Sequence, residues 1–320
     1  MGRIIVTGGA GFLGSRLIAN LLKEQGNKSF PAFKEILSVD LADCPVKDDR
    51  VKSVRGDIAN PDFAKKIVTA DTVAIYHMAA VLSGQSEAEF DTGMRVNVDG
   101  TRALLEAARK TGKKPFFIYT SSLAVFGGPM PDVVPEDLAL MPQSSYGAEK
   151  AIGELLVCEY SRKGFVDGRV CRLPTIVVRP GKPNSAASSF ASGIIREPLS
   201  GIKSNNPVPA STLMWLSSPD VVVKNLTHAL TVGEQELGLK RVLNLPGLCV
   251  SVDEMLESLE RVAGHETRML VSENPEQRII DIVCSWPGNF DVSRPLSLGF
   301  IRDRDFDSII RQYRDEFVIR

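Results

Sequence analysis

The sequence has few of the residues that form disulfide frameworks or metal sites. Its 320 residues include five cysteines, which lie far apart and form no C-x-x-C pair, and three histidines without metal-ligand spacing. An odd number of scattered cysteines indicates free thiols in a reducing compartment, and the histidine spacing does not favour zinc. We therefore expect no disulfide framework, no metal and a cytoplasmic location.

An excess of charge of one sign and long apolar runs are also missing. Lys and Arg total 38 against 39 for Asp and Glu, so the net charge of −1 leaves no basic excess for a nucleic-acid backbone. The longest mostly apolar stretch, residues 72–82, is about half of a membrane span, and the run at 4–6 is too short for a signal peptide. The chain also has neither a Walker-type phosphate loop nor the G-x-S-x-G turn of serine hydrolases. We expect no nucleic-acid partner and no membrane partner.

Short apolar runs alternate with helical patterns through the first half of the chain. The predicted strands are residues 4–6, 35–40, 51–54, 72–76, 115–120 and a sixth that begins at 170–171. The predicted helices between them are residues 15–25, 97–110 and 146–161. Strands that alternate with helices in this way are typical of βαβ units, so the sequence predicts a doubly wound parallel α/β sheet.

A glycine-rich turn joins the first strand to the first helix. Within residues 7–14 (TGGAGFLG), Gly9, Gly11 and Gly14 fit G-x-G-x-x-G, and Gly8, Gly11 and Gly14 fit G-x-x-G-x-x-G. Both alignments allow a pyrophosphate to approach the backbone at a helix N-terminus, where free N–H groups and the helix dipole favour anions. The turn therefore predicts a dinucleotide site.

An acidic residue follows at the end of the second strand. Asp40 lies 26 residues after Gly14, where a carboxylate accepts hydrogen bonds from the adenosine ribose and repels a 2′-phosphate. Residues 41–43 contain no Arg or Lys that would bind such a phosphate. We therefore predict NAD as the cofactor.

The composition changes after about residue 180. Residues 180–209 are rich in Pro, Ser, Gly and Asn, with one short predicted helix at 188–196. A capping box at Ser251–Glu254 predicts a helix that ends at Gly264, and a final amphipathic helix is predicted at 303–316. We expect residues 1–180 to form the NAD-binding Rossmann domain, with a strand near 241–245 returning to it, and residues 181–320 to form mainly a smaller substrate-binding cap.

A tyrosine and a lysine carry the chemistry that the sequence predicts. Tyr146 and Lys150 are four residues apart and share one face of a helix. Because a nearby ammonium stabilises a phenolate, this spacing predicts a tyrosine general base whose pKa is lowered toward neutrality. Ser122, after the fifth strand, is placed to donate a hydrogen bond to the reacting oxygen, and Ser121 is the alternative. His77, at the end of the fourth strand, is predicted to be a core histidine.

These motifs resemble the extended short-chain dehydrogenases/reductases, the superfamily of NAD-dependent epimerases and dehydratases. The resemblance rests on TGGAGFLG from residue 7, HMAA from 77, NVDGT from 97, TSSLAVFG from 120 and SSYGAEK ending at 150. It implies that Ser122, Tyr146 and Lys150 are catalytic. It also implies a cofactor site made of Gly8, Gly11, Phe12, Leu13, Gly14, Asp40, Asp57, Ile58, Ala79, Ala80, Asn97, Tyr146 and Lys150. Related enzymes pair the helices that begin at Asn97 and Tyr146, which implies a homodimer.

One further segment indicates a substrate class. Residues 172–198 look like the corresponding segment of D-erythronate dehydrogenases and lack the Asn-Pro-rich loop of epimerases. Leu and Ala at 123–124 replace the acidic pair that is usual in dehydratases. The resemblance therefore implies an NAD-dependent oxidoreductase that converts a small sugar acid, D-erythronate, to 2-dehydro-D-erythronate. A nucleotide-sugar 4-epimerase with tightly bound NAD is the alternative, and a cofactor-sensing protein without catalysis is a second one.

A sugar acid needs a cation for its carboxylate. The candidate cations are Arg179, Lys182 and Arg196, which follow the sixth strand. The expected substrate contacts are Ser83, Ser122, Tyr146, Arg179 and Asn184.

Overall fold

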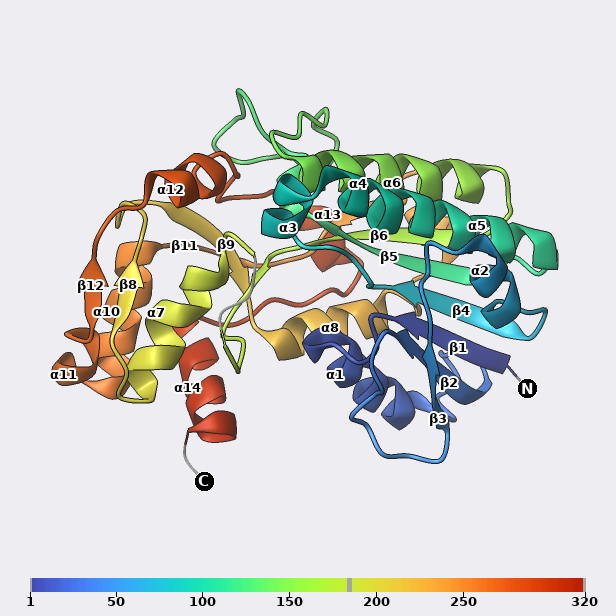
Figure 1. Cartoon of the computed structure of the whole chain (residues 1–320), viewed down its shortest axis with the longest axis horizontal. Helices are drawn as coiled ribbons and strands as arrows, with labels where there is room; N and C mark the ends of the chain where they lie inside the picture. Colours follow the sequence, from blue (N-terminus) through green and yellow to red (C-terminus); the bar gives the residue numbers. More distant parts are fainter. Residues whose placement is uncertain (1, 183–185, 319–320) are drawn as a thin grey trace.

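The main body is a parallel sheet of seven strands, seen in a computed structural model that describes residues 2–182 and 186–318. The strand order is β10-β6-β5-β4-β1-β2-β3, and every pairing is parallel (Figure 1). The strands are β1 (Gly2–Thr7), β2 (Phe33–Asp40), β3 (Val51–Arg55), β4 (Thr72–His77), β5 (Phe116–Ser122), β6 (Asp167–Leu173) and β10 (Val242–Asn244). The predicted doubly wound parallel fold is confirmed.

Helices cover both faces of this sheet. On one face lie α1 (Phe12–Leu21) and α8 (Pro219–His228), and on the other lie α2 (Pro61–Ile67), α5 (Gly100–Thr111) and α6 (Ser145–Arg162). In β1, Ile4 and Val6 pack with α1 and α8, whereas Ile5 packs toward α2 and α5. Because strands buried on both faces need apolar side chains at every position, the run at residues 4–6 does not alternate.

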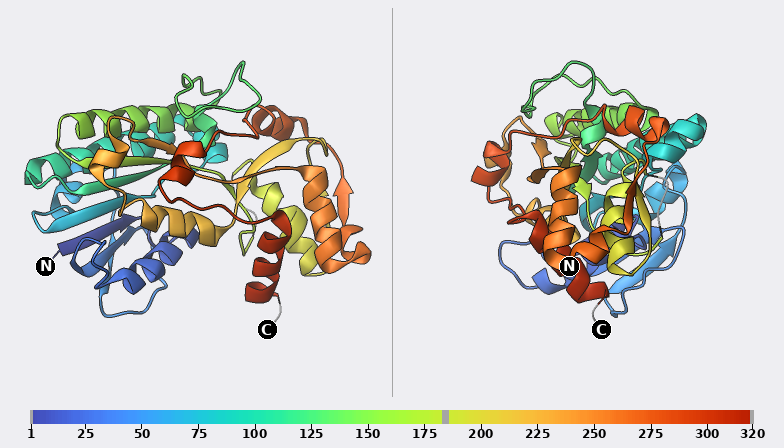
Figure 2. Two further views of the ribbon diagram at one scale, coloured as in Figure 1. Left: turned by 180° about the vertical axis from the view of Figure 1, so that it is seen from behind. Right: turned by 90° about the vertical axis from the view of Figure 1, so that its left-hand side faces the viewer.

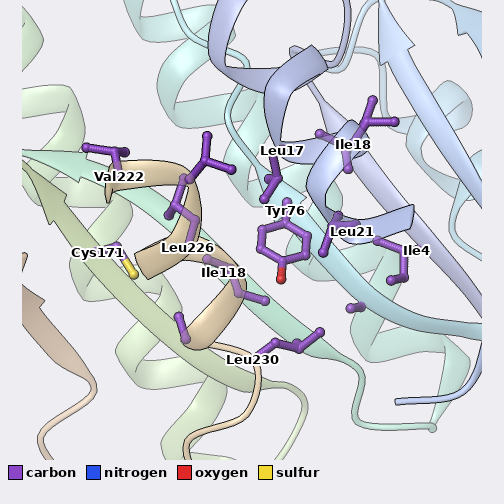
Figure 3. Close-up of a cluster of buried hydrophobic side chains, with 14 of the residues drawn as sticks. Ile4, Leu17, Ile18, Leu21, Tyr76, Ile118, Cys171, Val222, Leu226 and Leu230 are labelled. Carbon is purple, nitrogen blue, oxygen red and sulfur yellow. The ribbon is translucent and has the colours of Figure 1, made fainter. Parts of the chain in front are cut away.

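The second half of the chain completes the core of the first half. Figure 3 shows Leu226 and Val222 of α8 beside Leu17 of α1 and Tyr76 of β4. In addition, β10 pairs with β6 at the edge of the sheet. The division near residue 180 stays a prediction, and the main body includes at least these two later elements.

A smaller lobe lies at the carboxyl ends of the sheet strands (Figure 2). Its own core is formed by α7, α10, α14 and the small sheet β11-β9-β7. The elements of this half are β7 (Thr175–Ile176), α7 (Ser189–Leu199), β8 (Ser204–Asn206), β9 (Leu213–Ser217), α9 (Glu234–Leu237), β11 (Leu248–Ser251), α10 (Val252–Ala263), α11 (His265–Arg268), β12 (Val271–Glu273), α12 (Gln277–Val283), α13 (Ser293–Ser297) and α14 (Phe306–Phe317). The predicted capping box is present, since Glu254 N donates to Ser251 Oγ (3.1 Å) and Ser251 N donates to Glu254 Oε2 (2.7 Å).

The helix predicted from residue 97 begins differently. Two short helices, α3 (Ser83–Ala88) and α4 (Phe90–Gly93), lead into a π-helical segment at Met94–Asp99, and α5 starts only at Gly100. This segment packs on α6. A π-helical segment is commonly found next to a functional site. Among the described residues, no helix combines the length and the apolar character that a bilayer crossing requires.

Candidate active site

A cleft of about 300 Å³ opens at the carboxyl ends of β1, β4, β5 and β6, between the main body and the smaller lobe. The predicted site residues that line it are Gly8, Gly11, Phe12, Leu13, Gly14, Ala80, Ser83, Ser122, Tyr146, Lys150 and Arg179. The predicted residues that lie beyond this lining are Asp40, Asp57, Ile58, Ala79 and Asn97. Asn184 lies outside the described residues, so its predicted role stays a prediction.

The glycine turn leaves a helix N-terminus open to the cleft. Gly8 has φ +71°, and a Cβ on Gly14 would lie 2.1 Å from the carbonyl oxygen of Gly8. The turn is held by hydrogen bonds from Gly8 N to Val39 O (2.8 Å) and from Gly11 N to Gly8 O (3.1 Å). Gly11, the N-cap of α1, provides no side-chain acceptor for the first N–H groups of the helix. This close-packed turn with free donors fits the pyrophosphate of a dinucleotide.

Asp40 is fixed beside this turn. Its carboxylate accepts hydrogen bonds from Ala10 N (3.0 Å) and Leu41 N (2.7 Å). Strand β3 brings Arg55 opposite Asp40. This cation near Asp40 does not follow from the sequence of residues 41–43. Arg55 donates from Nε to Asp43 Oδ1 (2.8 Å) in an exposed ion pair. The guanidinium of Arg55 thus pairs with Asp43, and the carboxylate of Asp40 lies beside the glycine turn.

The other predicted residues near the adenine end make local contacts. Asp57 accepts a hydrogen bond from Ala59 N (2.9 Å) and forms an ion pair with Arg95 of the π-helical segment. Ile58 is buried in the core beneath α5. These contacts keep the β3–α2 turn in place beside the sheet edge.

His77 is a structural residue. Thr101 Oγ1 donates its one proton to the carbonyl of Asn97 (2.6 Å), so this oxygen accepts from His77 Nε2 (2.9 Å). With its proton on Nε2, His77 accepts at Nδ1 from Thr7 Oγ1 (2.8 Å). Thr7 Oγ1 in turn accepts from Ala79 N (3.1 Å). Burial, with Lys150 nearby, lowers the pKa of His77 to about 3, so the ring is neutral. This chain ties β1, β4 and α5 together.

The two adjacent serines have different surroundings. Ser121 Oγ donates to Glu154 Oε1 (2.5 Å), and Glu154 also binds Arg172 through two hydrogen bonds of 2.9 and 2.7 Å. Ser122 Oγ accepts from Ala124 N (3.2 Å), and its hydroxyl opposes the rise in the pKa of Tyr146. Ser121 belongs to a buried ion pair, and Ser122 lies beside the phenol. This arrangement favours Ser122 over Ser121.

Lys150 is buried at the base of the cleft. Its Nζ donates to Thr120 O (2.8 Å) and lies 4.8 Å from the ring centre of Tyr119 and 5.7 Å from that of Tyr146. Burial lowers the pKa of Lys150 to about 8, against the opposing effect of nearby carboxylates. The ammonium form therefore dominates at neutral pH and adds a cation–π contact.

The prediction that the pKa of Tyr146 is lowered toward neutrality is wrong. The pKa of Tyr146 is raised to about 12, mainly by burial and also by Glu149, while Ser122 and Arg179 oppose the increase. Lys150 donates its hydrogen bond to a backbone carbonyl, so burial outweighs its effect on the phenol. The phenol is therefore protonated at neutral pH.

The three candidate cations also differ. Arg196 donates to Arg179 O (2.8 Å) and forms an ion pair with Glu197 (2.5 Å), and Lys182 is exposed and does not line the cleft. Arg179 lines the cleft, and no carboxylate of the described chain forms an ion pair with it. Burial lowers the pKa of Arg179, and Arg196 adds to this effect. A half-buried cation without an anion is unfavourable, so this position suits an anionic ligand.

Several lining residues were not found from the sequence. They are Met78, Leu82, Thr120, Leu173, Pro174, Thr175, Ile176, Ser188, Ser192 and Trp286. Trp286 follows α12 in an irregular segment, where neither periodicity nor a motif marks it. Among the described residues, no group of three metal-ligating side chains is present.

The fold and the cleft define a dinucleotide-binding enzyme of the short-chain dehydrogenase/reductase class. The chain belongs to the NAD dependent epimerase/dehydratase family, which matches residues 4–215, and this confirms the predicted superfamily. NAD is the cofactor of this family, and the open N-terminus of α1 beside Asp40 fits it.

Individual proteins are similar over nearly the whole chain. The chain is 51% identical to D-erythronate dehydrogenase of Cupriavidus necator over 318 residues, and this aligned region covers 98% of each chain. It is 42% identical to D-erythronate dehydrogenase of Haemophilus influenzae, over 97% of this chain and 98% of that one. Among solved structures, a nucleoside-diphosphate-sugar epimerase from Agrobacterium tumefaciens is 38% identical with a TM-score of 0.93, over 99% of this chain and 94% of that chain.

The raised tyrosine pKa values can be tested by titration. Burial raises the pKa of all five tyrosines, namely Tyr76, Tyr119, Tyr146, Tyr160 and Tyr313. We expect the folded, cofactor-free protein to show little phenolate absorbance at about pH 10, where free tyrosine is about half ionised. Urea-unfolded protein at the same pH is the control and should show the ordinary absorbance. Half-ionised tyrosine in the folded protein would contradict this account of the cleft.

Proposed function

We propose that this chain is an NAD-dependent dehydrogenase that oxidises a small sugar acid, D-erythronate, to 2-dehydro-D-erythronate. The observation that carries this proposal is the position of Arg179 in the same cleft as Tyr146 and Ser122. A guanidinium that binds a substrate carboxylate there would leave the neighbouring C2 hydroxyl near the phenol. The relatives that are 51% and 42% identical are D-erythronate dehydrogenases, and they support this substrate.

The roles of three residues follow from their contacts. Ser122, which lines the cleft with Tyr146, orients the C2 hydroxyl, and Tyr146 takes its proton. Lys150 supplies a buried positive charge that favours the phenolate once the proton has to leave. When bound, NAD accepts the hydride from C2. Because burial raises the pKa of the phenol to about 12, oxidation should become faster as the pH rises.

The remaining assignments divide the cleft into a cofactor side and a substrate side. The cofactor side consists of the lining residues Gly8, Gly11, Phe12, Leu13, Gly14 and Ala80, and the substrate side of Ser83 and Arg179. We also assign to the cofactor five residues beyond the lining, namely Asp40, Asp57, Ile58, Ala79 and Asn97. In this division, residues 1–180 bind NAD and residues 181–320 form mainly the cap. We place the protein in the cytoplasm, because all five cysteines are free.

A nucleotide-sugar 4-epimerase is the second candidate. It is supported by the structural similarity to the epimerase from Agrobacterium tumefaciens. In such an enzyme the same tyrosine would make a keto intermediate, and the reduced cofactor would stay bound. The two functions therefore differ in whether NADH is released.

Substrate assays separate these candidates. Purified protein is mixed with NAD and a set of four-carbon sugar acids, with UDP-glucose and UDP-galactose in parallel samples. We expect many turnovers of NADH formation with D-erythronate, because each catalytic cycle releases the reduced cofactor. No NADH with any acid, together with interconversion of the UDP-sugars, would contradict the dehydrogenase and support the epimerase.

Arg179 provides a test of carboxylate binding. We expect Arg179→Ala to raise the KM for D-erythronate about 100-fold, because a charge-assisted pair with the substrate is lost. The KM for NAD should change little. Lys182→Ala removes a nearby exposed cation and is the matched control, with unchanged kinetics expected. Equal effects of the two substitutions on the KM for D-erythronate would contradict the role of Arg179.

The oligomeric state is part of the proposal. We propose a homodimer paired through α5 and α6, because α6 exposes Leu155 (67%) and Ile152 (36%). We expect sedimentation to give the mass of two chains, and Leu155→Glu to reduce it to one chain. Leu239→Glu, at a residue that is 92% exposed and outside both helices, is the control and should stay dimeric. Wild-type protein at the mass of one chain would contradict the dimer.

A further inference from the structure

A buried carboxylate lies between the two ionisable groups of the proposed reaction and takes no part in the roles assigned above. Glu149 is on α6 between Tyr146 and Lys150, and its side chain is fully buried (0% exposed). Its Oε2 accepts hydrogen bonds from Asn97 Nδ2 (2.6 Å) and Ser86 Oγ (3.0 Å). Its Oε1 has no hydrogen-bond partner among the described residues. Burying a carboxylate that has one oxygen without a hydrogen bond destabilises the fold, so we expect Glu149 to have a function that offsets this cost.

The contacts of Glu149 lead to the wall of the cleft. Besides donating to Glu149, Asn97 donates from Nδ2 to Val81 O (3.0 Å) and accepts at Oδ1 from Val81 N (2.8 Å). These three bonds fix the orientation of the amide. Val81 lies within residues 78–82, and Met78, Ala80 and Leu82 of this segment line the cleft. Glu149 and Asn97 thus connect α6 to the segment that follows β4.

The surrounding backbone is shaped to admit this carboxylate. A Cβ on Gly93, the last residue of α4, would lie 2.2 Å from Oε1 and 2.9 Å from Cδ of Glu149. The π-helical segment starts immediately after Gly93 and places Asn97 opposite Oε2. The space for Glu149 therefore depends on the absence of a side chain at residue 93.

We propose that Glu149 is a positioning residue that holds Asn97, and through it residues 78–82, against the helix that bears Tyr146 and Lys150. Residues 78–82, on the cofactor side of the cleft, are thereby kept at a constant distance from Tyr146 and Lys150. The proposal rests on the dehydrogenase function proposed above for its kinetic consequences. Its consequence for NAD binding does not depend on which acid is oxidised.

The charge of Glu149 has a second consequence. Glu149 faces Lys150 on its own helix and Glu87 on α3. Lys150 faces Glu149 and Glu154, while Tyr146 faces Glu149, Ser122 and Arg179. The negative charge favours the ammonium of Lys150 and disfavours the phenolate of Tyr146. Loss of this charge should therefore lower the pKa of both groups and move the pH dependence of oxidation to lower pH.

Two substitutions at residue 149 separate the effect of the negative charge from that of the side-chain length. Glu149→Gln keeps the length of the side chain and an accepting oxygen but removes the charge. We expect it to shift the pH profile of kcat downward by about one unit, with little change in NAD affinity. Glu149→Asp keeps the charge but withdraws the carboxylate from Asn97. We expect it to raise the Kd for NAD about ten-fold, measured by calorimetry, and to leave the pH profile unchanged.

A third substitution tests the geometry without altering Glu149. Gly93→Ala would push its Cβ against Oε1 and should also raise the Kd for NAD about ten-fold. The control is Glu159→Gln, which removes an exposed carboxylate from the same helix and should change neither quantity. If variants at residue 149 do not fold, the NAD affinity of Gly93→Ala still decides the question.

The positioning role is overturned if Glu149→Asp and Gly93→Ala bind NAD as the wild type does. The effect of the Glu149 charge on Tyr146 is overturned if Glu149→Gln keeps the wild-type pH profile. A protein that oxidises no sugar acid would contradict the proposed function alone. In that case the calorimetric affinities for NAD would still test the positioning role.

Discussion

All strands of the main sheet run in one direction, so the residues that follow them meet at a single edge. The glycine turn follows β1, residues 78–82 follow β4, Ser122 ends β5, and the segment with Arg179 follows β6. A parallel sheet must be covered on both faces, which confines access to this edge. The cleft, the smaller lobe above it and the candidate chemistry all depend on this common direction.

Burial at that edge gives the cleft its electrostatic character. It raises the pKa of the Tyr146 phenol and lowers those of Lys150 and Arg179, so in each case burial disfavours the charged form. Lys150 has a backbone carbonyl as its partner, and Arg179 has no carboxylate partner in the described chain. The cleft is thus suited to an anionic substrate, which would compensate the half-buried guanidinium of Arg179. The buried Glu149 limits how far the two cations can favour the phenolate.

Much of the fold could be predicted from the sequence because its signals are local. Continuous apolar runs marked strands buried on both faces, and the spacing of Tyr146 and Lys150 placed them on one helix face. Contacts between distant segments could not be predicted in this way: α8 packs on α1 about 200 residues away, and strand pairing places Arg55 opposite Asp40. The pKa of Tyr146 was mispredicted because helical spacing carries no information about burial, which is the larger effect here.

The most direct test of the central claim follows the hydrogen on C2 of the acid. D-Erythronate with deuterium at C2 is incubated with unlabelled NAD, and the NADH formed is examined by mass spectrometry. The account predicts that the released NADH carries one deuterium and that Tyr146→Phe greatly slows its formation. Release of unlabelled NADH, or retention of the deuterium in unchanged acid, would contradict oxidation at C2 by this cleft.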